Sequence, residues 1–165
     1  MDLSKLLGGD DDRALVDALV EQVRKERRCT LDRFVTVPNP CNEVERTVFF
    51  VWDSCAMICS SGLLYLFENN ADLAECSKCY LAVGLESVAS LFDRVARMLP
   101  EHLRDRDFRD IGRQFADWTD EDEVYNAFRA VDLEYFEQTT GEVVPDALGV
   151  YIRRHSDRLS HYLHP

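Results

Sequence analysis

The sequence predicts an all-α fold: a single compact domain of seven or eight helices around a buried central helix pair. Its 165 residues, of which 46% are hydrophobic and 30% charged, are typical of one globular domain with a substantial core. Apolar residues recur at steps of three and four along most of the chain, which is the period of a helix with one buried face. No alternating run has an obvious strand partner. We therefore expect one helical domain over residues 1–165.

The N-terminal part, residues 1–41, predicts a helix followed by a loop. The helix is expected over residues 10–28, because acids at its start and bases at its end suit the helix dipole. In residues 29–41, Pro38-Asn39-Pro40 excludes a helix, although the alternation around Phe34, Val35 and Val37 would allow a short extended piece.

The most apolar stretch, residues 52–69, predicts the central helix pair. Its first half repeats apolar residues at helical steps, and Asn42 with Glu45 three residues later forms a capping-box pattern at the start of that helix. Ser60-Ser61-Gly62 then interrupts the pattern, and Gly62 can adopt a positive φ at little cost. We expect a tight turn at Gly62 and a second buried helix that ends at Glu68-Asn69-Asn70.

The rest of the chain predicts further amphipathic helices separated by turn residues. Gly84, Pro100 and Thr139-Thr140-Gly141 are the expected breaks, and Pro145 fits the first turn of the last helix. The tail, residues 156–165, is polar and is expected to fray. The expected helices cover residues 71–83, 85–99, 101–118, 119–136 and the segment from Pro145 onward.

The composition excludes several classes of function. The formal charge is −12, from 31 acidic and 19 basic residues, so the chain repels nucleic acid and anionic membranes. No apolar run approaches the roughly 20 residues that span a bilayer. The N-terminus becomes acidic where a signal peptide would continue apolar. We expect a cytoplasmic protein that binds neither nucleic acid nor membrane directly and whose macromolecular partners are basic proteins.

Most of the excess charge lies in residues 119–150, where nine acids against one base give a net charge of −8. The helix dipole explains the first few acids, but not the later ones. Carboxylates one helical turn apart stand about 5–6 Å apart and present spaced negative charge, roughly as a phosphate strand does. The alternative is a solvated acidic face that serves only solubility. The predicted partner-binding face consists of Asp120, Glu121, Asp122, Glu123, Asp132, Glu134, Glu137, Glu142 and Asp146.

Motifs for catalysis or metal binding are weak in this sequence. There is no phosphate-binding glycine loop, zinc-protease motif or nucleophile elbow. The pairs Cys55/Cys59 and Cys76/Cys79 resemble halves of a zinc site, but both lie in helical patterns and are expected to be buried free thiols. Asp53 is expected to cap or hydrogen-bond to a neighbouring helix. We therefore expect neither an enzyme nor a bound metal or cofactor. The histidines are His102, His155, His161 and His164.

One segment resembles a known family. Residues 60–69, Ser-Ser-Gly-Leu-Leu-Tyr-Leu-Phe-Glu-Asn, resemble the signature of the bacterial DNA-mimic protein family, Asn-Gly-Gly-Phe followed by a Gln-Tyr-Phe-like run and Asn. Gly62, Phe67 and Asn69 match, whereas Ser60, Ser61 and Leu63 differ. With residues 72–99, 133–136 and 151–155, the resemblance covers about residues 42–158. It implies an all-α fold and, for members with an assigned role, an acidic face that occupies the DNA-binding surface of a regulator.

Three functions remain as hypotheses, and the first is favoured. In the first, the chain is a DNA-mimic interaction protein that occupies the DNA-binding surface of a basic DNA-binding protein, such as a helix-turn-helix regulator or a nucleoid-type protein. The alternative is an immunity or antitoxin protein that neutralises a basic toxin such as a nuclease, for which a neighbouring toxin gene would be the sign. The third is an enzyme or metal protein that uses Asp53, the cysteines or the tail histidines. A homodimer through aromatics such as Trp118 or Tyr125 is left open.

Overall fold

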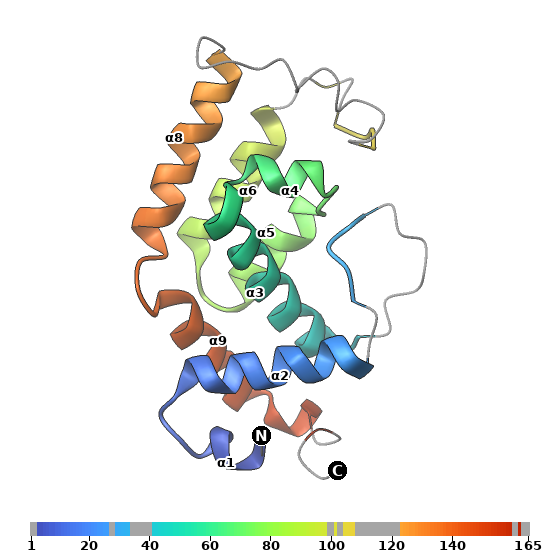
Figure 1. Cartoon of the computed structure of the whole chain (residues 1–165), viewed down its shortest axis with the longest axis vertical. Helices are drawn as coiled ribbons and strands as arrows, with labels where there is room; N and C mark the ends of the chain where they lie inside the picture. Colours follow the sequence, from blue (N-terminus) through green and yellow to red (C-terminus); the bar gives the residue numbers. More distant parts are fainter. Residues whose placement is uncertain are drawn as a thin grey trace.

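The computed structural model describes residues 3–26, 29–33, 41–98, 101, 104–107, 123–159 and 162 (Figure 1). Helices make up the regular structure of these ranges, and their one β-type pairing is an isolated bridge between Asp32 and Ala71, so the all-α prediction is confirmed. The helices are α1 (Leu3–Leu7), α2 (Asp12–Glu26), α3 (Glu43–Ser61), α4 (Leu64–Glu68), α5 (Leu73–Ala82), α6 (Glu86–Met98), α8 (Glu123–Gln138), α9 (Val143–Arg154) and the 3-10 helix η2 (Ser156–Leu159).

The long helix α3 forms the centre of the fold and contacts α2, α4, α5, α9 and η2. The predicted capping box starts it. Asn42 Oδ1 accepts hydrogen bonds from the backbone N–H groups of Val44 (2.9 Å) and Glu45 (3.0 Å), and Glu45 Oε2 accepts one from the Asn42 N–H at 2.8 Å. These bonds satisfy N–H groups that a helix N-terminus leaves without an intrahelical partner. The start of α3 is therefore fixed by local sequence.

The turn predicted at Gly62 ends α3. Gly62 has φ 79° and ψ 175°, a region of backbone conformation that is essentially restricted to glycine, and its N–H donates to the Ile58 carbonyl at 2.8 Å. The second helix of the predicted pair, α4, has only five residues. Leu63 and Leu66 are fully buried and attach it to the core. The central pair is thus one long helix and one short one.

The loop that follows α2 returns along the α4–α5 junction. The Arg33 N–H donates to the Asn70 carbonyl at 3.0 Å, and the Asp72 N–H donates to the Leu31 carbonyl at 2.9 Å. Cys29 and Cys41, at the two ends of this loop, form a disulfide. The extended piece predicted around Phe34, Val35 and Val37 lies outside the described residues.

Helix α8 runs along one edge of the molecule, on the left in Figure 1, while α2 and α9 lie below it in the lower part of the molecule. Helical spacing predicts that Val124, Phe128, Val131 and Tyr135 face inward. Phe128, Val131 and Tyr135 are buried, whereas Val124 is only partly buried. The Tyr135 hydroxyl shares a hydrogen bond of 2.9 Å with the Tyr80 hydroxyl of α5, which in turn donates to the Val51 carbonyl of α3 at 3.3 Å. A buried polar chain therefore joins α8 to α5 and α3.

The expectation of a helix over residues 101–118 is wrong for most of the part of this segment that the structure describes. The charged helix predicted over residues 101–118 is not helical at residues 104–107, which form a turn and a bend, because no apolar residue there gives a helix a face to bury. Residues 108–118, with Phe108, Ile111, Phe115 and Trp118, lie outside the described residues.

The described part of the tail, residues 156–159 and 162, is packed on the core. Residues 156–159 form η2, and both Leu159 and Tyr162 are buried, so two apolar side chains hold these residues in place. The other tail residues, for which fraying was expected, lie outside the described ranges. Helix α1 has no counterpart among the expected helices, because five residues are too few to show a helical period.

The capping box gives a first prediction. Asn42→Ala removes the acceptor for two N–H groups and should lower the free energy of unfolding by about 1–2 kcal/mol, as loss of an N-cap does elsewhere. Asn42→Ser keeps a side-chain oxygen and should retain most of that stability. Urea unfolding followed by circular dichroism measures both variants, and equal losses would contradict the capping role.

Candidate partner-binding surface

The outer side of α8 presents acidic residues because its inner side is apolar. Phe128, Val131 and Tyr135 face the core, so Glu123 and Glu137 fall on the opposite side, and both are exposed. Fourteen residues separate them, or about 21 Å along a helix at 1.5 Å per residue. Neither acid forms an ion pair within the part of the chain that the structure describes. Both carboxylates lie on the exposed side of the helix, where an external cation can approach them.

Asp132 lies on the flank of α8 that faces the α3–α4 turn. Its Oδ1 accepts a hydrogen bond from the backbone N–H of Leu63 at 2.7 Å. A Cβ atom placed on Gly62 would lie 2.7 Å from Asp132 Oδ2, closer than side chains tolerate. Burial raises the pKa of this carboxyl above its usual 3.8, and the Leu63 hydrogen bond and the charge of Arg129 oppose that rise. Asp132 thus fastens α8 to the turn, a contact that the sequence did not predict.

The residues that match the family signature lie around the same junction. Gly62 makes room for Asp132. The ring of Phe67 packs edge-on against Phe128 of α8, with 5.4 Å between the ring centroids. The Asn69 side chain donates to the Tyr65 carbonyl at 2.8 Å and closes α4. Two of the three signature residues therefore contact the acidic helix.

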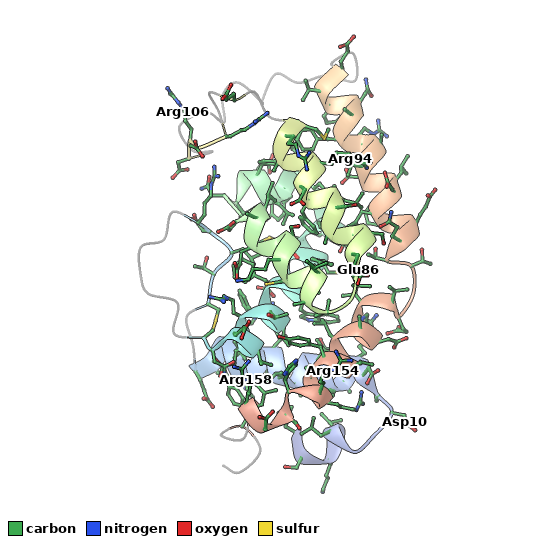
Figure 2. All side chains as sticks on the ribbon, turned by 180° about the vertical axis from the view of Figure 1, so that it is seen from behind. Asp10, Glu86, Arg94, Arg106, Arg154 and Arg158 are labelled. Atoms are coloured by element: carbon green, nitrogen blue, oxygen red, sulfur yellow. A yellow bond between two sulfur atoms is a disulfide. The ribbon has the colours of Figure 1, made fainter. Side chains whose placement is uncertain are left out.

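Two further acids of the predicted face form intramolecular ion pairs. Glu134 pairs with Arg94 of α6, which lies beside α8 (Figure 2). Glu142, just before α9, accepts two hydrogen bonds from the Arg13 guanidinium of α2, at 3.0 and 3.2 Å. Because these pairs are largely exposed, each contributes at most about 1 kcal/mol to stability. Their main effect is to orient the side chains and to offset part of the local negative charge.

The N-terminal ends of α2 and α9 meet and bring more acids to this side of the molecule. Between them lies a hollow of about 490 Å³, lined by Asp10, Asp11, Asp12, Arg13, Glu142 and Asp146. Asp10 and Asp11 are exposed, as is Asp146, whereas Asp12 is partly buried and pairs with Arg153. Asp10 projects from the lower end of the molecule in Figure 2.

Asp10 and Asp11 were not predicted to lie beside the acidic face. Their place at the start of the first helix indicates a role at the helix dipole, and Asp11 does cap α2, since its side chain accepts a hydrogen bond from the Ala14 N–H at 2.9 Å. Their position beside Glu142 depends on the packing of α2 against α9. No local sequence pattern predicts a contact between segments so far apart in the chain.

These residues define what we call the acidic edge. It follows α8, the start of α9 and the start of α2 along the left side of Figure 1. Asp120, Glu121 and Asp122 of the predicted face lie outside the described residues, and Asp132 lies on its inner flank. The acidic edge consists of Glu123, Glu134 and Glu137 of α8, Glu142 and Asp146 at the start of α9, and Asp10 and Asp11 before α2.

The four free cysteines differ in their burial. Cys76 and Cys79 are buried as expected, but Cys55 is half-buried and Cys59 is exposed, so the expectation of buried thiols is wrong for Cys59. Burial raises the pKa of Cys55 to about 11 and that of Cys79 to about 12, and it also raises the pKa of Cys76. Burial therefore disfavours the thiolate, which is the nucleophile and the metal ligand, at Cys55, Cys76 and Cys79.

The other candidate groups are tied to structural contacts or are not described. Asp53 pairs with Arg24 of α2, the contact to a neighbouring helix that the sequence predicted. His155 packs on the ring of Tyr151, whereas His102, His161, His164 and Trp118 lie outside the described residues. Within the described ranges, no group of three or more His, Cys, Asp or Glu side chains could hold a metal ion. In the same ranges, no helix is long and apolar enough to cross a bilayer.

Residues 39–155 match the model of the family described as DMP19-like protein. No curated protein and no solved structure matches the chain.

The contact between Gly62 and Asp132 predicts a large effect of a single methyl group. Gly62→Ala should cost about 1–3 kcal/mol more than Gly84→Ala, the usual range for an overpacked contact. Both glycines have positive φ (79° and 82°), so both variants bear a conformational cost of about 1–3 kcal/mol. Only at Gly62 does the new Cβ meet another residue, because nothing lies within 4 Å of a Cβ at Gly84. Chemical denaturation of both variants measures the difference, and equal losses would contradict the close contact.

The raised pKa of Asp132 predicts that the difference in stability between the wild type and an Asp132→Asn variant depends on pH. The pKa of this carboxyl group is raised in the folded state, so the ionised carboxylate is disfavoured there and stability falls as pH rises from 3.8 through the raised pKa. Asp132→Asn keeps an acceptor for the Leu63 N–H without this charge, so it should be as stable as the wild type at pH 7 or slightly more so. Asp132→Ala leaves that N–H unpaired and should cost about 1–3 kcal/mol.

Unfolding curves between pH 3.5 and 7, spanning about the region of the titration, measure both effects. The stability gained by the Asn variant over the wild type should grow with pH. A loss of stability in the Asn variant that grows with pH would show that the charge itself holds α8 in place.

Proposed function

This chain belongs to the DMP19-like protein family, a family of DNA-mimic proteins, and from that membership and the position of its charges we propose that it binds a DNA-binding protein through the acidic edge. In doing so it occupies the surface that would otherwise hold DNA, and so keeps its partner off DNA. The partner we propose is a bacterial transcriptional regulator with a basic DNA-binding surface, and the site of action is the cytoplasm.

The observation that supports this proposal most strongly is the distribution of unpaired carboxylates. Glu123, Glu137 and Asp146 are exposed, and no ion pair within the described residues engages them. Asp10 and Asp11 extend the same charge beyond residues 119–150. An acidic surface that served only solubility would have no need to gather charge on one side, because dispersed acids serve equally well.

The physical basis of recognition is the same as for DNA. A protein that binds DNA places Lys and Arg side chains against phosphates, and these contacts supply much of its affinity without reading sequence. Carboxylates spaced along a rigid helix can satisfy the same cations. Because the charges are exposed, added salt screens them and should weaken the complex. Association should also be fast, since a field of one sign steers an oppositely charged partner.

Neutralising the unpaired carboxylates tests the proposal. The tagged chain captures proteins from its host, and each captured protein is tested for DNA binding in the presence of increasing amounts of the chain. The wild type should displace DNA from its partner. The triple variant Glu123→Gln, Glu137→Gln, Asp146→Asn should need at least about tenfold more protein for the same displacement, because close charge pairs at interfaces are often worth more than 1.4 kcal/mol in total.

A matched control separates position from net charge. Glu26→Gln, Asp93→Asn, Asp157→Asn removes the same three charges from exposed positions outside the acidic edge, and it should displace DNA almost as well as the wild type. If the two triple variants behave alike, the acidic edge has no special role. If the captured proteins keep their DNA, the mimicry proposal fails, and a captured toxin or nuclease would favour the antitoxin alternative.

A further inference from the structure

The acidic helix α8 also has an exposed row of apolar residues. Ala127, Ala130, Leu133 and Phe136 follow one another at steps of three, and all four are exposed. Leu133 is 66% exposed and Phe136 is 39% exposed, among the most exposed large hydrophobic side chains of the described residues. We call this row the apolar ridge. A single exposed leucine would need no explanation, but a row of four neighbouring apolar side chains does.

The spacing of the apolar ridge suits a helix as its partner. Side chains three residues apart form one of the ridges by which a helix packs into the grooves of another helix. On α8 this ridge crosses the outer side, away from the buried face of Phe128, Val131 and Tyr135. Among the described residues, no contact covers Leu133.

The charges beside the apolar ridge indicate which helix it would receive. Glu134 and Glu137 flank it on one side, and Glu123 lies one turn before Ala127. Arg129 and Asp132 lie on the other side, so the acids around the ridge outnumber the one base. An interface with an apolar centre and a charged rim is the common arrangement of protein–protein contacts. The partner helix must therefore present apolar residues on one face and basic residues around them. A second copy of this chain would bring the same acids opposite one another in a two-fold contact, which like charges oppose.

We propose that the apolar ridge is the docking site for a cationic amphipathic helix of the partner protein. This proposal rests on the proposed function and specifies it: the acidic edge attracts a basic surface, and Leu133 and Phe136 anchor one helix of that surface. Apolar burial is insensitive to the screening that weakens exposed charges. The ridge therefore contributes binding free energy that added salt does not weaken. It also lets the chain discriminate among basic proteins.

Two synthetic peptides of equal composition test this proposal. Each has about 18 residues of Leu and Arg, the length of five helical turns. In one peptide the leucines lie on a single helical face, and in the other they are dispersed around the helix. Isothermal titration at low salt and at about 0.3 M salt compares their affinities for the full chain. At the higher salt the amphipathic peptide should bind about tenfold more tightly than its isomer, since central apolar anchors typically contribute at least this factor.

Variants of the chain show which residues cause the preference for the amphipathic peptide. Leu133→Ser with Phe136→Ser should abolish the preference for the amphipathic peptide. Leu81→Ser, which removes a 56%-exposed leucine from α5, should leave it unchanged. Because these side chains are exposed, the variants should keep the wild-type circular dichroism spectrum. Equal affinity of the two peptides for the wild type, or a preference that survives loss of Leu133 and Phe136, would overturn the proposal.

The remaining outcomes separate this proposal from the proposed function. If both peptides bind equally and the Glu123, Glu137 and Asp146 triple variant weakens both, the charge recognition stands and the apolar anchor is wrong. If neither peptide binds even at low salt, both proposals fail. If sedimentation shows that the wild type is a dimer that the Leu133/Phe136 variant dissociates, the ridge joins two copies of this chain and the docking proposal is overturned.

Discussion

The close approach of Asp132 to Gly62 is the constraint on which the position of the acidic helix depends. The α3–α4 turn needs φ 79° at Gly62, and the Asp132 carboxylate of α8 occupies the space that a side chain there would fill. The same carboxylate accepts the Leu63 N–H. The glycine is therefore required twice, once for the backbone conformation and once for the contact with α8. This explains why a turn in the core and an acidic helix some seventy residues later belong to one architecture.

Neutral contacts strengthen this junction and leave the outward charges available. Phe67 packs on Phe128, and the Tyr80 and Tyr135 hydroxyls share a buried hydrogen bond, so α8 is held mainly by aromatic burial. In a helix attached by surface ion pairs, the charges would be paired with neighbouring residues of the same chain and would contribute little to stability. Among the ion pairs of the described residues, Glu134 is the acid of α8 that is engaged in this way, whereas Glu123 and Glu137 face outward.

The sequence predicted what local spacing determines. Apolar steps of three and four identified the inward side of α8, and the Asn42–Glu45 pattern located the start of α3. The signature at residues 60–69 indicated the family. Contacts between distant segments were not predictable in this way: the role of Asp132, the meeting of Asp10 and Asp11 with Glu142, and the Cys29–Cys41 disulfide all depend on packing. The buried tail was missed because two apolar residues, Leu159 and Tyr162, are too few to form a pattern.

The central claim is that the acidic edge and DNA compete for one surface of the partner. Hydrogen–deuterium exchange of the captured DNA-binding protein tests it directly, with the protein measured alone, with its DNA and with this chain. The same peptides of the partner should be protected by DNA and by the chain, and protection of the chain itself should fall on residues 123–138, 142–146 and 10–13. Protection of different partner peptides by DNA and by the chain, or a complex that holds both at once, would contradict the account.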